Sequence, residues 1–159
     1  MQNKMKNFGL IPVKNFGQVS DLVFRSAQPI YNYEYQWLKN VVGIDLIVNL
    51  RAEKDRDAKY APVHGIDSVT IPVKDHQAPS YDNVEAFNHV LIKAMAENKK
   101  VLIHCEHGHG RTSTFSVIAK ILSGSTFDEA INQEKEEFNY TFKYQSQIDF
   151  LSDYAKTIN

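Results

Sequence analysis

The residues of this chain with the clearest chemical potential form one short run, His104-Cys105-Glu106-His107-Gly108-His109-Gly110-Arg111-Thr112-Ser113. It holds the chain's one cysteine, and five positions (106 to 110) separate that thiol from Arg111. A loop of that length can curl until the guanidinium faces the sulfur. Gly108 and Gly110 permit positive φ angles, which turn successive backbone N–H groups to one side. The run therefore predicts a nest for a dianion with a nucleophile at its floor.

The same surroundings favour the thiolate form of Cys105. A free cysteine has a pKa of about 8.5, and helix N-termini or nearby cations lower it. Arg111, the loop amides and the hydroxyl of Thr112 would all stabilise a negative sulfur. We expect His104 to orient the loop by hydrogen bonding to the backbone rather than to act as the base. The alternative is that Cys105 is a small buried hydrophobe, but the two glycines and the strand-to-helix setting favour the nucleophile.

The elements that must position this loop can be read from the spacing of apolar residues. The apolar run 101–103 predicts a buried strand, and residues 114–122 predict an amphipathic helix. Apolar patterns elsewhere predict strands over 22–26, 44–50 and 68–73, and the second is nearly all apolar and therefore central. They predict helices over 33–42 (with Asn32 as cap and Gly43 as stop), 80–96 (with Ser80 as cap), 125–136 and 145–155.

Strands that alternate with helices indicate an α/β domain, with a central, mostly parallel sheet of four to five strands covered by helices on both faces. The anion nest would then lie at the carboxyl end of a strand, where such sheets place ligands. The chain has 159 residues and a mass of 18.2 kDa, which fits one domain over 1–159, with residues 1–18 as an N-terminal extension.

Composition excludes several classes of partner. Eighteen Lys and Arg residues against nineteen Asp and Glu leave a net charge of -1. The chain therefore lacks the excess of positive charge by which proteins bind nucleic acid or an anionic membrane surface. A single cysteine allows no intrachain disulfide and fits a reducing compartment. No apolar run is long enough to span a bilayer, and the first twenty residues lack the apolar region of a signal peptide. We expect a cytoplasmic monomer.

The pattern His-Cys-x-x-Gly-x-Gly-Arg-Thr resembles the phosphate loop of the cysteine-dependent phosphatases, the protein tyrosine and dual-specificity superfamily. The resemblance implies that superfamily's fold and a phosphocysteine mechanism with no metal or other cofactor. Cys105 would attack phosphorus, Arg111 would grip two phosphate oxygens, and Thr112 would ease departure of the thiolate. The loop between them would bind the phosphate through Glu106, His107, Gly108, His109 and Gly110.

Asp75 is the candidate general acid. Alkoxide and phenoxide leaving groups need a proton, and Asp75 lies on a loop that directly follows a predicted strand and ends at Pro79. This position resembles the acid loop of the superfamily. The alternative is a solvated aspartate that forms a turn. His76 could contact substrate or lie on the surface.

The stretch from residue 15 to residue 121 resembles one branch of the superfamily, which holds small atypical dual-specificity phosphatases and tyrosine-phosphatase-like inositol phosphatases, or phytases. Glu106 after the cysteine, the Asp75-His76 pair, and Tyr140 with Lys143 resemble phytase features. The implied substrate is an inositol polyphosphate such as myo-inositol hexakisphosphate. The alternative is a small dual-specificity or tyrosine protein phosphatase.

A highly phosphorylated inositol needs several cations beside the reaction centre. The basic residues on segments that could border the nest are Arg25, Arg51, Lys54, Lys74 and Lys143. Basic residues between positions 53 and 59 alternate with acidic ones, as on a solvated segment, so a surface role for these is the alternative.

Three other classes fit the loop less well. His104, Cys105, His107 and His109 could chelate zinc or copper, but ligands this close together suit a tetrahedral site poorly and Arg111 would repel the metal, so we expect none. A catalytically dead phosphate-binding module is disfavoured because the nucleophile, the acid and the arginine are all present. A sulfurtransferase of the rhodanese type needs no general acid, so Asp75 disfavours it.

Overall fold

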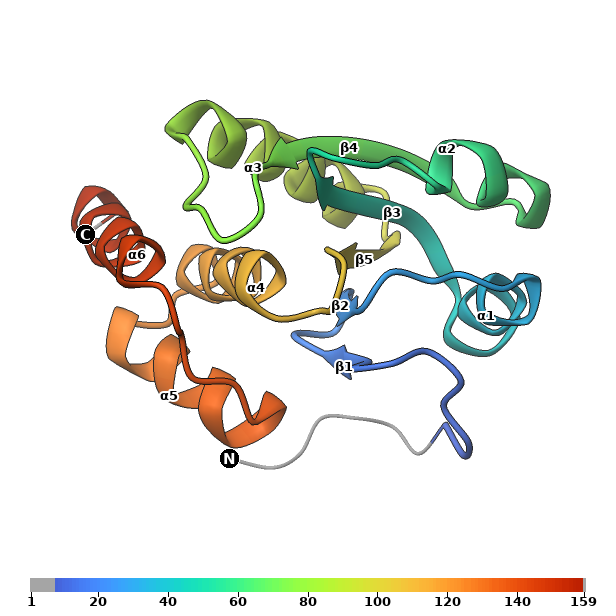
Figure 1. Cartoon of the computed structure of the whole chain (residues 1–159), viewed down its shortest axis with the longest axis horizontal. Coiled ribbons are helices and arrows are strands. Elements are labelled where there is room, and N and C mark those ends of the chain that lie inside the picture. Colours follow the sequence, from blue (N-terminus) through green and yellow to red (C-terminus); the bar gives the residue numbers. More distant parts are fainter. Residues whose placement is uncertain (1–7, 159) are drawn as a thin grey trace.

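A computed structural model describes residues 8–158 of the chain, and residues 1–7 and 159 lie outside the described part. Its centre is a five-stranded sheet in the order β1-β2-β5-β3-β4 (Figure 1). The inner pairs β2–β5, β5–β3 and β3–β4 are parallel, and the edge pair β1–β2 is antiparallel. The strands are β1 (Gly17–Gln18), β2 (Val23–Ser26), β3 (Ile44–Arg51), β4 (Asp67–Val73) and β5 (Lys100–His104).

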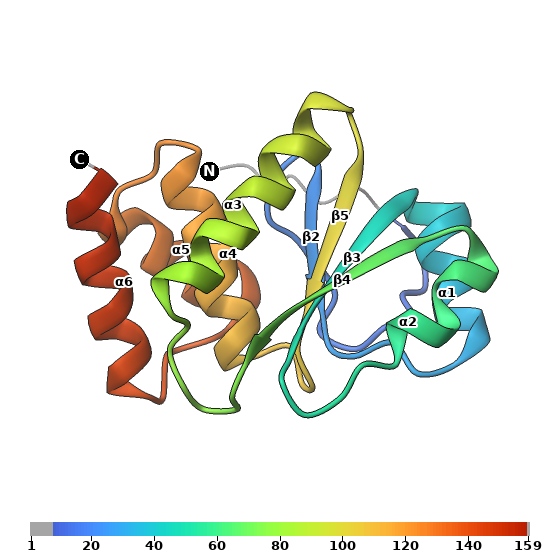
Figure 2. The ribbon, with the colours of Figure 1, turned by 90° about the horizontal axis from the view of Figure 1, so that it is seen from above.

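Helices cover both faces of this sheet, as Figure 2 shows from above, with α1 and α2 on one side and α3 to α6 on the other. The helices are α1 (Asn32–Trp37), α2 (Asp57–Tyr60), α3 (Tyr81–Ala96), α4 (Gly110–Leu122), α5 (Phe127–Phe138) and α6 (Gln145–Ile158). A π-helical turn (Leu38–Val42) continues α1, and a 3-10 turn (Pro62–His64) follows α2. The predicted fold class, a mostly parallel sheet between two helical layers, is confirmed.

Two hydrophobic cores lie on the two faces, and successive residues of one strand alternate between them. On β5, Val101 and Ile103 belong to the core under α3 and α4, whereas Leu102 belongs to the core under α1. All three are almost completely buried. Because both faces of β5 are covered, its sequence is a continuous apolar run rather than an alternating one. This buried strand fixes the position at which the Cys105 loop leaves the sheet.

Most predicted element ends are close to those observed. Ser80 caps α3, because its Oγ accepts a hydrogen bond from the Asn83 amide at 3.0 Å. Gly43 adopts a φ of 89° at the end of the π-helical turn, a left-handed conformation that favours glycine. The predicted cap at Asn32 is wrong: Tyr31 occupies that position, and the Glu34 carboxylate accepts from the Tyr31 amide at 3.1 Å.

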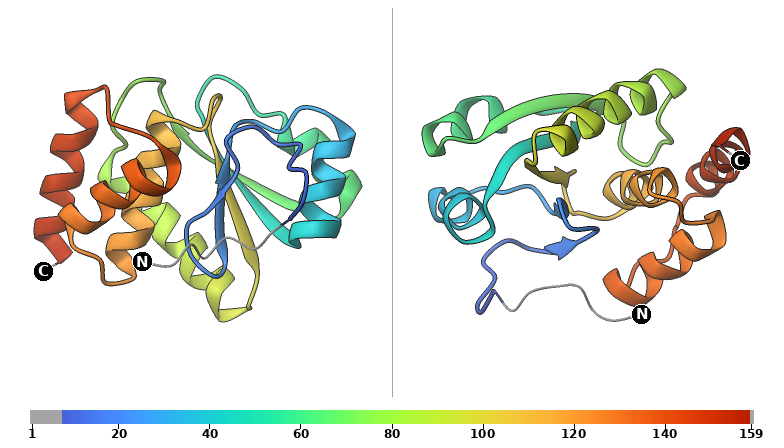
Figure 3. Two further views of the ribbon diagram at one scale, coloured as in Figure 1. Left: turned by 90° about the horizontal axis from the view of Figure 1, so that it is seen from below. Right: turned by 180° about the vertical axis from the view of Figure 1, so that it is seen from behind.

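The segment before β1 packs onto the sheet rather than standing apart from it. Val13 is buried, and Phe8 and Phe16 both pack edge-to-face against Trp37, with ring centroids 5.8 and 4.9 Å apart. The left view of Figure 3 shows this dark-blue segment beside α1. Residues 8–18 of the predicted extension therefore contribute to the core under α1, whereas the rest of that extension, residues 1–7, lies outside the described residues. Within the described chain no helix combines the length and apolarity needed to cross a membrane.

Candidate active site

Cys105 directly follows β5, and its loop ends where α4 begins at Gly110. The sulfur is buried, with 4% of the residue exposed, and the hydroxyl of Thr112 donates a hydrogen bond to Sγ at 2.9 Å. Thr112 itself is fully buried in the first turn of the helix. The helix N-terminus and the hydroxyl both stabilise negative charge on the sulfur, so the arrangement suits a thiolate nucleophile.

Four successive carbonyl groups of the loop are bound by the surrounding scaffold. The Cys105 carbonyl lies 3.0 Å from the His104 ring, and the Glu106 carbonyl accepts from the Gln28 amide at 3.1 Å. The His107 carbonyl accepts from the Asn15 side chain at 2.6 Å, and the Gly108 carbonyl accepts from Arg25 at 3.0 Å. These contacts fix the backbone of the loop beside the sulfur. That its amides form an anion nest stays a prediction.

Gly108 is required by close packing. Its φ is 77°, and a side chain there would place Cβ 2.8 Å from the backbone of Ser26 and Ala27. The loop therefore rests on the end of β2 with no room for a methyl group. Gly108 supports the nest from the outside rather than lining the cavity.

Arg111 has its guanidinium fixed on one side by acceptors. Nη1 donates to Glu53 at 2.7 Å and to the Val73 carbonyl at 2.9 Å, and Nη2 donates to Glu53 at 3.1 Å. Nε is buried without a hydrogen-bond partner among the described residues. Burial would lower the pKa of Arg111, but the hydrogen bond and charge of Glu53 raise it above its ordinary value. A charged arginine with an unused donor is suited to bind a phosphate oxygen.

Glu53 is a site residue that the sequence analysis missed, and it carries a testable pH dependence. Chiefly because Arg111 donates to it, the pKa of Glu53 falls from 4.5 to about 2. A carboxyl group whose pKa is lower in the folded state stabilises that state fully at pH values above its unfolded-state pKa. This contribution is lost as the pH falls through the folded-state pKa. The Glu53 side chain is 41% exposed, so water screens this pair, and we expect about 1 kcal/mol.

We therefore expect Glu53→Gln to be less stable than the wild type at pH 7 by about 1 kcal/mol, with most of that difference gone at pH 3. Urea unfolding at pH 7, 5 and 3 measures it. Glu136→Gln, at an exposed position of α5, removes the same charge and should show no such trend. A Glu53 difference that stays constant from pH 7 to pH 3 would contradict the role of the ion pair.

The predicted acid lies on the loop after β4, which approaches the N-terminal end of α4 (Figure 1). Oδ1 of Asp75 is 3.4 Å from Nη2 of Arg111, and the Asp75 side chain is 49% exposed. The ring of His76 stacks on Tyr144 at 4.6 Å, and Gln147 donates to the Gln77 carbonyl at 3.2 Å. The start of α6 thus holds this loop beside Arg111. Tyr144 and Gln147 were not predicted from the sequence, although Tyr144 directly follows the predicted Lys143.

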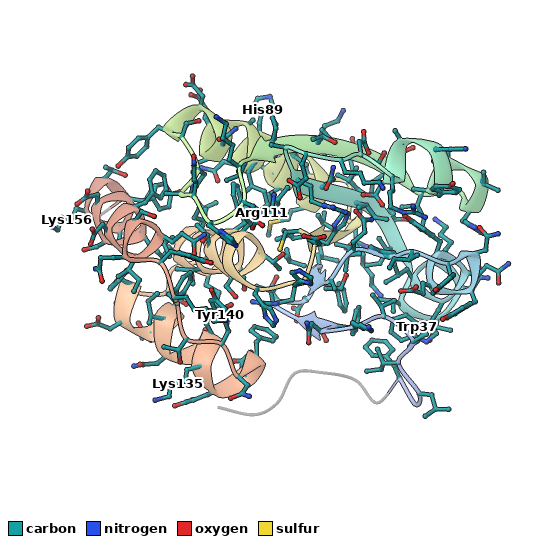
Figure 4. The ribbon with its side chains drawn as sticks, viewed as in Figure 1. Trp37, His89, Arg111, Lys135, Tyr140 and Lys156 are labelled. Atoms are coloured by element: carbon teal, nitrogen blue, oxygen red, sulfur yellow. The ribbon has the colours of Figure 1, made fainter. Side chains whose placement is uncertain are left out.

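One cavity of about 120 Å³ brings most of the predicted site residues together. Figure 4 shows Arg111 at the beginning of α4 and Tyr140 on the connection between α5 and α6. The predicted residues that line this cavity are Asp75, His76, Cys105, Glu106, His107, His109, Gly110, Arg111, Tyr140 and Lys143, and Tyr144 completes it. Chain segments more than sixty positions apart therefore converge on the cysteine.

Two predicted substrate contacts are corrected. Arg25 is only 2% exposed, and its guanidinium is bound to Glu134, Ser113 and the Gly108 carbonyl behind the loop. It supports the nest but cannot reach a substrate. Lys54 is exposed and lines neither this cavity nor the neighbouring hollow.

The charges around the cavity are unevenly distributed. Lys143 lies on the side of α6, and His109, whose pKa burial and neighbouring cations lower, stacks on Tyr140 at 5.6 Å. On the opposite side a hollow of about 430 Å³ is lined by Arg51, Ala52, Glu53, Lys74, Asp75 and Glu106. The Glu106 carboxylate lies 3.7 Å from Arg51 and 3.6 Å from His107. It therefore faces two basic side chains of the protein, and a carboxylate cannot itself donate to a phosphate.

The described residues do not gather the ligands for a metal ion. Across residues 8–158 no group of three or more His, Cys, Asp and Glu side chains is arranged to hold one. His104, one of the candidate ligands, is fully buried and directed at Asp57 and the Cys105 carbonyl. The arrangement of thiol, arginine and carboxylic acid is instead suited to nucleophilic displacement at phosphorus.

The chain is similar to known phosphatases in sequence and in fold. Residues 22–125 match the family Tc-R-P, polymorphic toxin system, DSP-PTPase phosphatase. None of the curated proteins matches the chain significantly.

Several solved structures share the fold. Tk-PTP in its active form superposes with a TM-score of 0.80 at 24% identity, over 92% of this chain and 99% of that one. The core catalytic domain of the PP-IP phosphatase SIW14 from S. cerevisiae gives 0.72 at 23% identity, over 94% and 93%. PTPMT1 in complex with PI(5)P gives 0.76 at 17% identity, over 90% and 96%. These likenesses confirm the predicted fold.

Proposed function

This chain belongs to the DSP-PTPase phosphatase family of polymorphic toxin systems, and on that premise we propose that it is a metal-independent phosphomonoesterase with a phosphocysteine intermediate. One observation carries the proposal: Cys105, Arg111 and Asp75 line the same cavity. Asp75 comes from the loop after β4, whereas Cys105 and Arg111 follow β5. A thiolate, a phosphate grip and a proton donor are the three groups that this reaction needs.

In the first step the Cys105 thiolate attacks phosphorus and forms a P–S bond, while the P–O bond to the leaving group breaks. Arg111 binds the phosphate oxygens through its unused Nε, with the loop amides around them. Asp75 transfers its proton to the leaving oxygen, which departs as an alcohol. When the phosphate dianion pairs with Arg111, its negative charge favours the protonated form of the neighbouring acid.

In the second step water attacks the phosphocysteine and the P–S bond breaks. Asp75, now a carboxylate, accepts the proton of the water, and the products are inorganic phosphate and the thiolate. The Thr112 hydroxyl, 2.9 Å from Sγ, stabilises the departing sulfur. Atoms and charge balance without a metal or a redox partner.

We propose an inositol polyphosphate, such as myo-inositol hexakisphosphate, as the substrate. Lys143, His76, His107 and His109 supply donors around the reaction centre, and Tyr140 adds a hydroxyl. Such donors suit phosphates on neighbouring carbons of one ring. The likeness in fold to a PP-IP phosphatase and to a protein bound to PI(5)P is consistent with this choice.

A second candidate, a small tyrosine or dual-specificity protein phosphatase, is favoured by the aromatic wall and by three carboxylates. Tyr140 and Tyr144 line the cavity and could flank a phenyl ring, whereas Glu53, Asp75 and Glu106 would repel additional phosphates. Initial rates with inositol hexakisphosphate and with a phosphotyrosine peptide, each with and without chelator, compare the two. Preference for the peptide would reject the inositol phosphate, and loss of rate with chelator would reject the metal-independent mechanism.

Lys143→Ala should lower kcat/KM for inositol hexakisphosphate about tenfold, because one charge-assisted contact to a second phosphate is lost. Turnover of an aryl phosphate should change less than about twofold, since that substrate has no second phosphate for Lys143 to bind. Lys135→Ala is the matched control, because Lys135 is exposed on α5 and lines no part of the cavity. Equal losses for both substrates would favour the protein phosphatase.

A further inference from the structure

We infer that Gln147 is a positioning residue for Asp75, and that it holds the acid loop (residues 74–79) where the protonated acid reaches the leaving oxygen. The inference rests on the proposed function, in which Asp75 is the general acid. Gln147 lies in the first turn of α6, and its Nε2 donates to the Gln77 carbonyl, 70 positions away, at 3.2 Å. Gln147 does not line the cavity of the nucleophile, so it acts on the reaction only through another residue.

The acid loop has little packing of its own. Residues 74–77 are all exposed, and the Gln77 amide donates to the Lys74 carbonyl at 3.1 Å, which closes a tight turn. Within this turn His76 has a φ of 68°, a left-handed conformation that costs a residue other than glycine about 1–3 kcal/mol. A strained and exposed turn keeps one conformation only when contacts from the surrounding structure fix it.

The contact between Asp75 and Arg111 does not supply that support during catalysis. Oδ1 of Asp75 lies 3.4 Å from Nη2 of Arg111, but this attraction needs the negative charge of the carboxylate. A general acid is protonated when the bond to the leaving group breaks, and the bound phosphate then competes for the same guanidinium. The acid form of the loop must therefore be held by contacts that do not involve the Asp75 carboxyl group.

The beginning of α6 makes two such contacts. The Gln77 carbonyl accepts from Gln147, and the ring of His76 stacks on Tyr144 with the ring centroids 4.6 Å apart. Tyr144 and Gln147 are three positions apart, and the Gln147 backbone amide donates to the Tyr144 carbonyl at 3.1 Å. Both side chains therefore belong to one helical turn. Neither contact depends on whether Asp75 is protonated or ionised.

The Gln147 side chain is itself fixed against the beginning of α4. It is fully buried, and a Cβ added to Gly110 would lie only 3.1 Å from both Nε2 and Oε1 of Gln147. The Gln77 carbonyl determines which way the amide points, because the reverse orientation would set two oxygen atoms against each other. Since Gly110 directly precedes Arg111, Gln147 joins the acid loop to the helix end that carries the phosphate-binding arginine.

The leaving group reports on this role, because only a poor leaving group needs the proton of the acid. Gln147→Met keeps the length of the side chain and removes the donor to the Gln77 carbonyl. We expect it to lower kcat/KM for an alkyl phosphate about tenfold, and for nitrophenyl phosphate less than about twofold. Gln147→Asn, whose amide sits on a side chain one methylene shorter, should show the same pattern and replaces Gln147→Met if that variant does not fold.

Gln145→Met is the matched control. Gln145 is exposed on the same turn of α6, and its side chain donates to Asp149 of the same helix at 2.9 Å. It does not line the cavity, so its rates should equal those of the wild type for both esters. A loss in Gln145→Met equal to that in Gln147→Met would overturn the inference.

A double variant separates positioning from a general loss of structure. If Gln147 acts through Asp75, adding Gln147→Met to Asp75→Asn should change kcat/KM for the alkyl ester by less than about twofold. A further tenfold loss in the double variant, no loss in Gln147→Met, or a loss in Gln147→Met that is equal for both esters would overturn the inference and leave the acid in place. Equal losses for both esters in Asp75→Asn would instead reject the acid of the proposed function, and this inference with it.

Discussion

Replacing Cys105 with serine should abolish phosphate release, with a loss of at least about 10⁴-fold in kcat, as expected when the nucleophile of a covalent mechanism is removed. A serine hydroxyl does not ionise near neutral pH, whereas the thiol lies beside Thr112 and a helix N-terminus that favour its ionised form. Substrate binding should survive, because Arg111 and the loop amides are unchanged. Stopped assays of phosphate release and calorimetric titration with inorganic phosphate measure the two properties.

Acid quenching of the wild-type enzyme during turnover of a ³²P-labelled substrate should trap a labelled protein. The label should map to the peptide with the single cysteine and be absent from Cys105→Ser. Thr112→Val serves as a second comparison: it keeps the nucleophile but removes the donor to Sγ, so the labelled intermediate should accumulate. Normal turnover by Cys105→Ser, or an unlabelled wild-type protein, would reject covalent catalysis.

Asp75→Asn should slow poor leaving groups far more than good ones. Loss of a general acid costs about 10²- to 10⁴-fold, and an inositol alkoxide cannot leave without a proton. A nitrophenoxide can, so its phosphate ester should lose much less. Arg111 should keep its place in this variant, because Glu53 and the Val73 carbonyl still hold its guanidinium. The kcat values for alkyl, phenyl and nitrophenyl phosphates give the dependence on leaving group.

Asp82→Asn is the matched control for this measurement. Asp82 is exposed in the first turn of α3, a few positions beyond the acid loop. The substitution therefore removes the same charge from the same region, at a residue that does not line the cavity. Its rates should equal those of the wild type for every ester. Equal losses for alkyl and nitrophenyl esters in Asp75→Asn would remove Asp75 as the acid.

The nucleophile loop and the elements on either side of it can be predicted from the amino-acid sequence. The curl from Cys105 to Arg111 depends on Gly108, whose φ is 77°, whereas Gly110 begins α4 without the positive φ that the sequence predicts. The strand and helix around the loop follow from local apolar spacing. The ends of α3 and of the π-helical turn depend on Ser80 and Gly43, which act on neighbouring backbone groups. Such features involve positions close in sequence, so their residue types are enough to predict them.

Which distant side chains contact the loop depends on the packing of the folded chain. Arg25 pairs with Glu134, 109 positions away, rather than with substrate, and Glu53 reaches Arg111 across 58 positions. Asp57 meets His104 across 47 positions, and Gln147 meets the acid loop across 70. The residues around Glu53 show the alternating charges of a solvated surface, and nothing in that pattern distinguishes the one carboxylate that binds Arg111. The partners of buried charges depend on how the sheet and its two helical layers pack, and a local pattern does not contain that information.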